Sequence, residues 1–361
     1  MSQSLYIALA GILSIVSMPL IILICKKFSL YDYQNSRKIH SGNIPRLGGV
    51  GIFCAFIISS LAFILINKED NFNHILPILI AGTIVFIFAL LDDLLTLPAL
   101  AKLIVQLIAV SIVVLNGFRF KQIFGWTLPL PISFILSFCW ILGVINAYNL
   151  IDGLDGLCGS FSITTIITLG VLYSLTGNPE ATLCFILAAS ILGFLCFNWP
   201  PAKLFMGDAG SQFLGFMIAV FPLFCSDSVF EYNKFLIMIV ITAFPVFDTI
   251  AAIWRRLRDK KPIMSPDRSH LHHKLLNMGY SKKSALYLLC FLQVLLCGSV
   301  VISYFLGAKR GMALLLESTA FVTLFFSFVH YTNRAVIAKQ LNEAKNHTAE
   351  TKSPDSTEEN S

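Results

Sequence analysis

Long runs of apolar residues are the feature that most restricts how this chain can fold. Runs of roughly 14–22 mostly apolar residues recur along it, and nearly all are long enough to cross a ~30 Å hydrocarbon core as an α-helix. A helix satisfies its own backbone hydrogen bonds in lipid, where water is absent. The sequence therefore predicts an all-α, polytopic membrane protein with about eleven transmembrane helices. The expected spans are residues 5–25, 48–66, 75–91, 100–116, 132–148, 161–176, 181–197, 212–225, 235–254, 285–306 and 312–331.

The composition excludes several other classes of protein. Of the 361 residues, 56% are hydrophobic and only 13% are charged, against roughly 25% charged residues in a soluble domain. The net charge of +6 does not indicate nucleic-acid binding, because the Lys and Arg residues lie beside apolar runs. The nine Cys residues are scattered without the spacing of a metal site. They are therefore expected to be small buried side chains.

The distribution of Lys and Arg predicts the orientation in the membrane. An odd number of spans places the two termini on opposite sides. With the N-terminus outside, 20 of the 26 Lys and Arg residues fall in cytoplasmic loops and the tail, as the positive-inside rule requires. We expect residues 1–331 to form a transmembrane domain with its active site on the cytoplasmic face, and residues 332–361 to form a polar, disordered cytoplasmic tail. Outside, residues 117–131 are expected to form a small amphipathic hairpin.

A polar stretch in the middle of the chain is the first candidate for a functional site. Two Asn and two Asp recur there at every third residue, so on a helix their side chains would fan over one half of the surface. The alternative is a polar turn between two membrane helices, where Asn, Asp and Gly are common. The four residues are Asn146, Asn149, Asp152 and Asp155.

Two further groups of charged residues are expected at the same membrane face. Asp92 and Asp93 end the third apolar run, and adjacent carboxylates repel each other unless a cation or a proton-transfer role accounts for them. The alternative is a simple interfacial end of the helix. Lys102 opens the next run, where it could contact the site or extend to lipid headgroups.

The loop at residues 198–211 carries a third carboxylate. Asp208 lies between two glycines at the start of a new apolar run, so backbone N–H groups and a carboxylate could meet there. Mg²⁺ prefers one or two such carboxylates together with phosphate oxygens of a substrate. The alternative is an ordinary helix N-cap formed by Asp208 or Ser211.

A loop rich in His follows the ninth run. The spacing of His270, His272 and His273 is too close for the usual zinc sites, and their Cys and Glu partners are missing. With Arg268 and the preceding basic run, a phosphate-binding cradle fits better. Most of the basic run is expected to serve as a positive-inside anchor. Asp248 could join this site or pair with the neighbouring basic residues of its own helix.

Taken together, these residues predict carboxylates, a cation and substrate phosphates at one membrane face. Carboxylates crowded at one interface need a counter-cation or must hold protons, and a metal ion bound to a diphosphate meets that need. One substrate would be a lipid phosphate and the other a water-soluble phosphate compound. Phosphoryl transfer between two anions demands charge neutralisation above all.

The order of these motifs resembles that of the polyprenyl-phosphate N-acetylhexosamine-1-phosphate transferases. The resemblance covers roughly residues 35–285, and five motifs follow the family's order. Its last motif, His-Leu-His-His, resembles the branch that starts O-antigen, enterobacterial common antigen or teichoic acid, and differs from the muramoyl-pentapeptide branch. The motifs are residues 46–49, 92–93, 146–157, 198–211 and 270–273.

The resemblance implies a reaction and a set of residue roles. N-acetylglucosamine-1-phosphate would move from UDP-N-acetylglucosamine to undecaprenyl phosphate, releasing UMP, at the bacterial cytoplasmic membrane. It implies Mg²⁺, or Mn²⁺ in its place, and is compatible with a homodimer. The implied metal ligands are Asn149 and Asp208; the catalytic residues are Asp92, Asp93, Asp152 and His270; the substrate-binding residues are Arg46, Lys102 (donor diphosphate), Asn146, Asp155 (uracil), Arg268, His272 (phosphate) and His273.

Two alternatives remain at this point. Within the same chemistry, the donor could be another UDP-sugar, such as a UDP-N-acetylmuramoyl-pentapeptide. From another class, a lipid or sugar transporter would use polar groups as a pathway, but such groups usually lie near the middle of the membrane rather than at one face. For the enzyme, either the lipid phosphate attacks the donor directly or an Asp attacks first. Direct attack is favoured because the transferred group then passes through the anionic centre only once.

Overall fold

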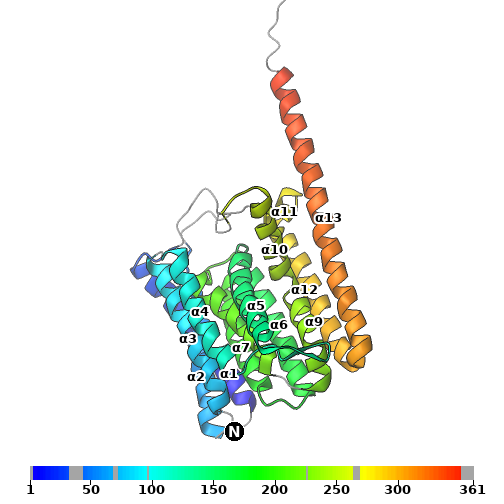
Figure 1. The fold of residues 1–361 in the computed structure, drawn as a ribbon. Coiled ribbons are helices and arrows are strands. Elements are labelled where there is room, and N and C mark those ends of the chain that lie inside the picture. The colour runs from blue at the N-terminus through cyan, green and yellow to red at the C-terminus, as the bar shows by residue number, and fades with distance from the viewer. Residues whose placement is uncertain are drawn as a thin grey trace, which may run out of the picture.

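Helices make up nearly all of the structure, a computed structural model that describes residues 3–31, 44–67, 72–95, 97–224, 227–262 and 269–350. Most of these helices run side by side as a bundle (Figure 1). The prediction of an all-α membrane protein is confirmed. The helices are α1 (Gln3–Lys27), α2 (Gly48–Asn67), α3 (Phe72–Leu95), α4 (Ala99–Leu115), α5 (Leu130–Ile151), α6 (Leu157–Leu175), α7 (Ala181–Asn198), α8 (Gly207–Val220), η1 (Phe221–Phe224), α9 (Ser228–Ile241), α10 (Ala243–Arg258), α11 (Leu271–Asn277), α12 (Lys282–Phe305) and α13 (Gly307–Glu350).

The number of membrane spans is close to the predicted eleven. In the described part of the chain, nine helices are long and apolar enough to cross a membrane, and the bent pair α9 and α10 raises the number to ten if it counts as one span. The remaining predicted run lies in α4, which has 17 residues and is about 25 Å long at 1.5 Å per residue. Whether α4 crosses the bilayer stays a prediction.

The break between α9 and α10 was not anticipated. The apolar run predicts one span over residues 235–254, but the two helices meet at 68°. Pro245 has no N–H to donate to the carbonyl of Ile241, four residues earlier. That carbonyl instead accepts hydrogen bonds from Thr165 Oγ1 at 3.1 Å and Gln293 Nε2 at 2.8 Å. Side chains of neighbouring helices thus satisfy the backbone group that the proline leaves open.

Helix α8 is the most enclosed element and positions the candidate site. It packs against α3, α5 and α2, and the N-terminal ends of α2 and α8 approach closely through glycines. Gly48 N–H donates to the Phe205 carbonyl and Gly49 N–H to the Met206 carbonyl, both at 2.8 Å. A Cβ on Gly49 would lie 2.4 Å from the backbone nitrogen of Gly210. Small residues permit such close approach between membrane helices.

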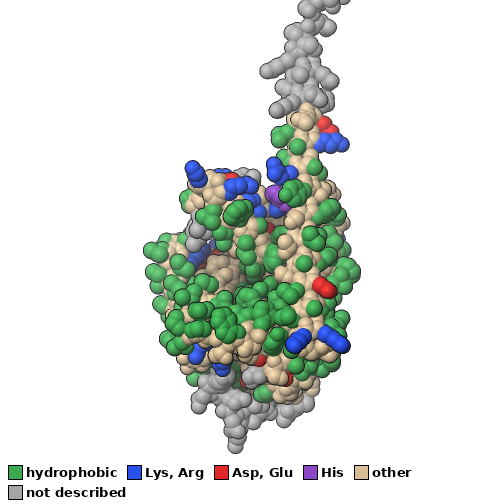
Figure 2. Space-filling model, turned by 45° about the vertical axis from the view of Figure 1, so that its right-hand side comes forward, with side chains coloured by type: hydrophobic (Ala, Val, Ile, Leu, Met, Phe, Trp, Pro, Cys, Tyr) green, Lys and Arg blue, Asp and Glu red, His purple; other side chains and the backbone are tan. Residues whose placement is uncertain are grey.

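The outer surface of the bundle matches a lipid environment. Figure 2 shows apolar side chains in a broad band around the middle of the molecule, with Lys and Arg side chains near its two ends. Many large apolar residues are exposed, among them Leu107, Ile135 and Phe291. A soluble protein rarely exposes apolar patches of this extent. The described chain is a multi-pass membrane protein.

A small hairpin follows α4, as expected for residues 117–131. Strands β1 (Gln122–Ile123) and β2 (Trp126–Thr127) pair antiparallel, with Ile123 opposite Trp126. The two turn residues, Phe124 and Gly125, both have positive φ angles of 51° and 80°, as in the turns that suit the twist of a hairpin.

Helix α13 extends well beyond its expected end. The sequence predicts a span over 312–331 and a disordered tail over 332–361, but α13 continues to Glu350 and projects from the bundle (Figure 1). The added segment contains four Ala, two Lys and two Glu residues, which favour helix, and extending an existing helix avoids the cost of nucleation. Residues 351–361 lie outside the described residues.

The two ends of the described chain lie at opposite ends of the bundle. The start of α1 and the end of α13 are far apart in Figure 1. Which end faces the cytoplasm stays a prediction from the distribution of Lys and Arg.

The close contact at Gly49 yields a test of helix packing. In Gly49→Ala the new methyl group meets the backbone of Gly210, which cannot move aside without shifting α8. We expect the free energy of unfolding to fall by about 1–3 kcal/mol, measured as a lower thermal midpoint in detergent. Gly143→Ala in α5 is the control, because nothing lies within 4 Å of its Cβ position. Equal stability of Gly49→Ala and the wild type would contradict this packing.

Candidate active site

Three helix ends meet around Lys102. Asp92 lies in the last turn of α3, Lys102 in the first turn of α4 and Asp208 in the first turn of α8. The Lys102 ammonium group forms an ion pair with Asp92 and lies 3.6 Å from Asp208 Oδ2. Asp92 is buried and also accepts a hydrogen bond from Leu97 N at 2.8 Å. Lys102 therefore contacts the two carboxylates rather than extending alone to lipid headgroups.

Asp93 caps α8 from another helix. Its two carboxylate oxygens accept hydrogen bonds from the backbone N–H groups of Asp208 at 3.1 Å and Ala209 at 2.9 Å. A carboxylate is favoured there because unpaired N–H groups point outward at a helix N-terminus. The alternative of Asp208 as an N-cap is wrong, because Met206 occupies the N-cap position and makes no side-chain cap bond.

Gly207 and Arg46 complete this contact. Gly207 has a φ angle of 78°, and a Cβ there would lie 2.3 Å from the Arg46 carbonyl oxygen and 2.8 Å from Asp93 Oδ2. Only glycine fits this position without strain. The Arg46 guanidinium group donates a hydrogen bond to the backbone carbonyl of Asp93. Arg46 thus ties the start of α2 to the end of α3.

The central polar stretch joins this group of residues. Asn149, in the last turn of α5, donates to Ser211 Oγ at 3.1 Å and lies close enough to the Asp208 carboxylate to stabilise its charged form. Asp152 is the C-cap residue of the same helix. The two residues expected to hold a metal ion, Asn149 and Asp208, therefore lie next to each other.

A chain of amides lies one turn deeper in the bundle. Asn146 donates to Gln106 Oε1 at 3.1 Å, and Gln106 donates to Gln212 Oε1 at 3.0 Å. The motifs predict a role for Asn146 but for neither glutamine. Gln106 lies four residues after Lys102 and Gln212 four residues after Asp208, so each shares a helix face with a charged residue. That spacing was the signal that could have found them.

Asp155 and Asn198 fix the loops on either side of α6 and α7. Asp155 is 8% exposed and accepts a hydrogen bond from Ala202 N at 3.2 Å. Asn198 accepts from Gly156 N at 2.9 Å and donates to the Leu204 carbonyl at 2.8 Å. The sequence analysis included Asn198 in a motif without assigning it a role. In the structure it connects the central stretch to the loop that leads into α8.

The histidines pack against the central stretch from the side. His272 is 2% exposed, and a Cβ on Gly153 would lie 2.8 Å from its Nε2 atom. The His270 ring is parallel to that of His272, and the His273 ring lies 4.2 Å from His272 between centroids. Asp248 bonds to His270 Nδ1 at 2.9 Å. Arg268 lies outside the described residues.

The donor set suits a hard cation that also binds a substrate. In the described residues no group of three or more His, Cys, Asp or Glu side chains could hold a metal ion by itself. Mg²⁺ needs fewer protein ligands, because it keeps water and takes phosphate oxygens. Asp208 supplies carboxylate oxygens, and Asn149 and Asp92 lie next to it.

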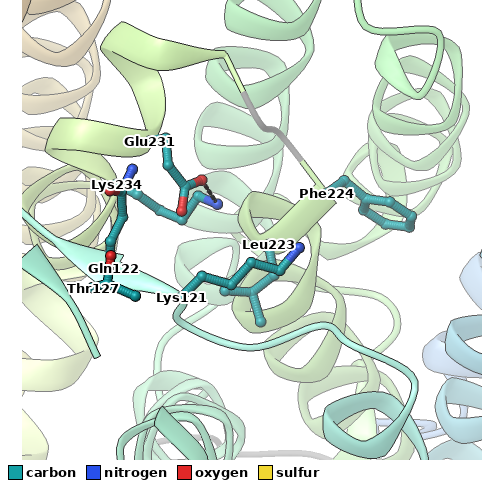
Figure 3. Close-up of a pocket in the computed structure, with 7 residues that line it drawn as sticks. All are labelled: Lys121, Gln122, Thr127, Leu223, Phe224, Glu231 and Lys234. Atoms are coloured by element: carbon teal, nitrogen blue, oxygen red, sulfur yellow. Dashed lines mark hydrogen bonds and ion pairs between the residues drawn. The ribbon is translucent and has the colours of Figure 1, made fainter. Parts of the chain in front are cut away.

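A cavity at the other end of the bundle is separate from this site. It has a volume of about 260 Å³ and lies beside the hairpin that follows α4, whereas Lys102 opens α4. Figure 3 shows Lys121, Glu231 and Lys234 around it, with the ion pair between Glu231 and Lys234 drawn as a dashed line. That pair neutralises its own charges, which leaves Lys121 as the one further charged residue among the described residues that line the cavity.

Sequence comparison identifies the family. Residues 75–226 match the family described as glycosyl transferase family 4. A probable undecaprenyl-phosphate N-acetylglucosaminyl 1-phosphate transferase of Bacillus subtilis (strain 168) is 32% identical over 351 residues, which cover 92% of this chain and 91% of that protein. The chain belongs to glycosyl transferase family 4.

Other relatives agree with this membership. The undecaprenyl-phosphate alpha-N-acetylglucosaminyl 1-phosphate transferase of Yersinia pestis is 31% identical over 75% of this chain and 76% of its own length. The decaprenyl-phosphate N-acetylglucosaminephosphotransferase of Mycobacterium leprae (strain TN) is 28% identical over 78% of each chain. The resemblance drawn from five motifs is confirmed. As a member of glycosyl transferase family 4, the chain is an enzyme, and the cluster around Lys102 is its candidate active site.

His272 links this site to acid stability. Burial, together with the neighbouring His273 and His270, lowers the pKa of His272 to about 3, from ~6.5 in an unfolded chain. Between these values the unfolded chain binds a proton that the folded chain excludes. Stability therefore falls as the pH drops through this window.

We expect His272→Gln to reduce this sensitivity to acid. The measurement compares thermal midpoints of the wild type and the variant in detergent at about pH 7.5 and about pH 5. The wild type should lose more stability, by up to ~1.4 kcal/mol per pH unit. Equal losses in the two proteins would show that His272 is not held neutral.

Proposed function

We propose that this enzyme transfers N-acetylglucosamine-1-phosphate from UDP-N-acetylglucosamine to undecaprenyl phosphate and releases UMP. The observation that carries the proposal is the meeting of Asp92, Asp93, Lys102, Asn149 and Asp208 at one end of a membrane bundle. The donor and acceptor follow the names of its relatives from Bacillus subtilis and Yersinia pestis. A site at a membrane face can receive a lipid phosphate from the bilayer and a nucleotide from water.

Charge neutralisation is the main task of the proposed site. Both substrates are anionic, and the transfer places them in contact at one phosphorus atom. Lys102 would contact the donor diphosphate, exchanging part of its ion pairing with Asp92 and Asp208 for phosphate oxygens. Asp208 and Asn149 would hold Mg²⁺, or Mn²⁺ in its place, which supplies positive charge to the diphosphate.

Direct attack by the lipid phosphate is the mechanism that fits Asp93 best. An oxygen of the acceptor phosphate attacks the sugar-bearing phosphorus, and the bond from that phosphorus to the bridging oxygen of the donor breaks, so that UMP leaves. An aspartyl intermediate would need a carboxylate that is free to turn toward the donor phosphorus, and hydrogen bonds that hold the carboxylate elsewhere reduce its nucleophilicity. Both carboxylate oxygens of Asp93 already accept backbone hydrogen bonds from α8. Asp93 therefore suits a role in shaping the site, and Asp92 a place near the acceptor phosphate.

The remaining predicted residues surround this centre. Asp155, next to the loop that leads into α8, would contact uracil, and Asp152 lies between it and Asn149 in the sequence. His270 and His272 would bind phosphate. Because His272 is neutral, it would do so as a hydrogen-bond partner and not as a cation. Asn146, Arg46, Arg268 and His273 complete the proposed substrate-binding set.

The proposed location is the bacterial cytoplasmic membrane, with the site on its cytoplasmic face. The distribution of Lys and Arg supports this side, and sugar nucleotides are cytoplasmic compounds. The product would start a surface polysaccharide, either O-antigen or another polymer made by this branch of the family. A homodimer is a further prediction.

A transporter is the rival from another class. Transport sites usually lie at the middle of the membrane, between broken helices. Here the charged cluster lies at helix ends, and the broken pair α9 and α10 is closed by side-chain hydrogen bonds to the Ile241 carbonyl. These observations favour the enzyme.

A panel of radiolabelled UDP-sugars tests the proposal. The purified wild type is mixed with undecaprenyl phosphate and Mg²⁺, and the lipid fraction is extracted and counted. We expect label in lipid from UDP-N-acetylglucosamine with an equal amount of released UMP, and at least roughly tenfold less from UDP-N-acetylgalactosamine and UDP-N-acetylmuramoyl-pentapeptide.

Two variants test whether the transfer depends on Asp208. Asp208→Asn should abolish measurable transfer, whereas Asp259→Asn, an exposed residue paired with Arg258, should leave the rate within about twofold. Label in lipid from another UDP-sugar alone would overturn the proposed donor. Movement of label across a vesicle membrane without release of UMP would indicate the transporter instead.

A further inference from the structure

Asp248 makes two hydrogen bonds that the reaction scheme above does not use. It lies in α10 and is 2% exposed. Its Oδ2 atom lies 2.9 Å from His270 Nδ1, and its Oδ1 atom accepts from Leu271 N at 3.0 Å. The two partners are neighbours at the start of α11, 22 and 23 residues further along the chain. Asp248 therefore holds the histidine loop against the bundle.

The pair of contacts determines where the His270 ring carries a proton. A backbone N–H can only donate, so Oδ1 accepts from Leu271. An ionised carboxylate has no proton to give, so Oδ2 also accepts, and His270 Nδ1 must carry the hydrogen. The second ring nitrogen, Nε2, is then the atom through which His270 can exchange a proton or a hydrogen bond with a substrate.

We propose that Asp248 is a positioning residue that fixes the tautomer and the orientation of His270 for the transfer reaction. This inference rests on the proposed function. A carboxylate that holds an imidazole by Nδ1 is a recurrent way of directing Nε2 at a reacting group. His270 is 5% exposed and its ring is parallel to that of His272, which packs on Gly153 in the central stretch. The fixed ring thus lies beside the central polar stretch that also carries Asn149.

Asp248→Asn separates this role from simple packing. An amide of the same shape has one oxygen and one NH₂ group, so it cannot accept from both partners. Because the Leu271 N–H group needs a hydrogen-bond acceptor, the amide oxygen turns toward it and the NH₂ group faces His270. Nδ1 then becomes the acceptor and the ring proton moves to Nε2. The variant keeps the shape of the site and inverts the tautomer.

The test is a double-variant cycle on the rate of transfer. Wild type, Asp248→Asn, His270→Gln and the double variant are assayed with UDP-N-acetylglucosamine and undecaprenyl phosphate. We expect Asp248→Asn to lower kcat by roughly 10–100-fold with little change in KM for the donor. The double variant should be no slower than His270→Gln, because Asp248 acts through that ring. Asp259→Asn is the matched control and should stay within about twofold of the wild type.

A spectroscopic measurement gives a result that does not depend on activity. In protein with ¹⁵N-labelled histidine, the His270 signals are those lost in His270→Gln. The wild type should show a protonated Nδ1, and Asp248→Asn a protonated Nε2 with an unprotonated Nδ1. If Asp248→Asn fails to fold, the wild-type spectrum alone still decides, because a neutral ring protonated only at Nε2 would overturn the proposal.

The experiments distinguish failure of the positioning role of Asp248 from failure of the proposed function. If the wild type transfers no label from UDP-N-acetylglucosamine, the donor assignment fails. The NMR measurement still determines which tautomer His270 adopts. If the wild type is active and the effects of Asp248→Asn and His270→Gln multiply in the double variant, Asp248 does not act through His270. An equal kcat for Asp248→Asn and the wild type would also overturn the positioning role.

Discussion

The ion pairs of Lys102 are the interaction on which the candidate site depends. Lys102 joins Asp92 at the end of α3 to Asp208 at the start of α8, while Asp93 caps α8 through two backbone N–H groups. Removing charges from water is costly unless they are paired and hydrogen-bonded. Three carboxylates and the two cations Lys102 and Arg46 leave one negative charge when all are ionised. A divalent cation that arrives with the donor diphosphate would offset that charge.

Much of this arrangement could be predicted from the sequence. The apolar runs predicted the helices, because a chain in lipid has few ways to satisfy its backbone. Alternate helix ends fall on the same membrane face, so Asp92, Lys102, Asn149 and Asp208 could be placed together before any contact was known. The order of five motifs predicted the family, which the comparisons confirm. Membrane topology therefore accounts for most of what could be predicted about the site.

The rest depends on contacts between residues far apart in the sequence. Asp248 in α10 meets His270, and α10 turns away from α9, whereas the apolar run predicts the two helices as one span. Pro245 was a local signal for that break, but its consequence depends on Thr165 and Gln293, which satisfy the freed carbonyl. The length of α13 was missed because its last turns are polar and their helical state depends on extension from the membrane segment.

Binding of Mn²⁺ tests most directly whether the site binds a divalent cation together with the donor. In detergent, the purified protein with UDP-N-acetylglucosamine is titrated with Mn²⁺, and free Mn²⁺ is measured by electron paramagnetic resonance. The charge arrangement predicts one bound Mn²⁺ per chain and an affinity lower by roughly tenfold or more in Asp208→Asn, with Asp259→Asn unchanged. An affinity in Asp208→Asn equal to that of the wild type would contradict the central claim.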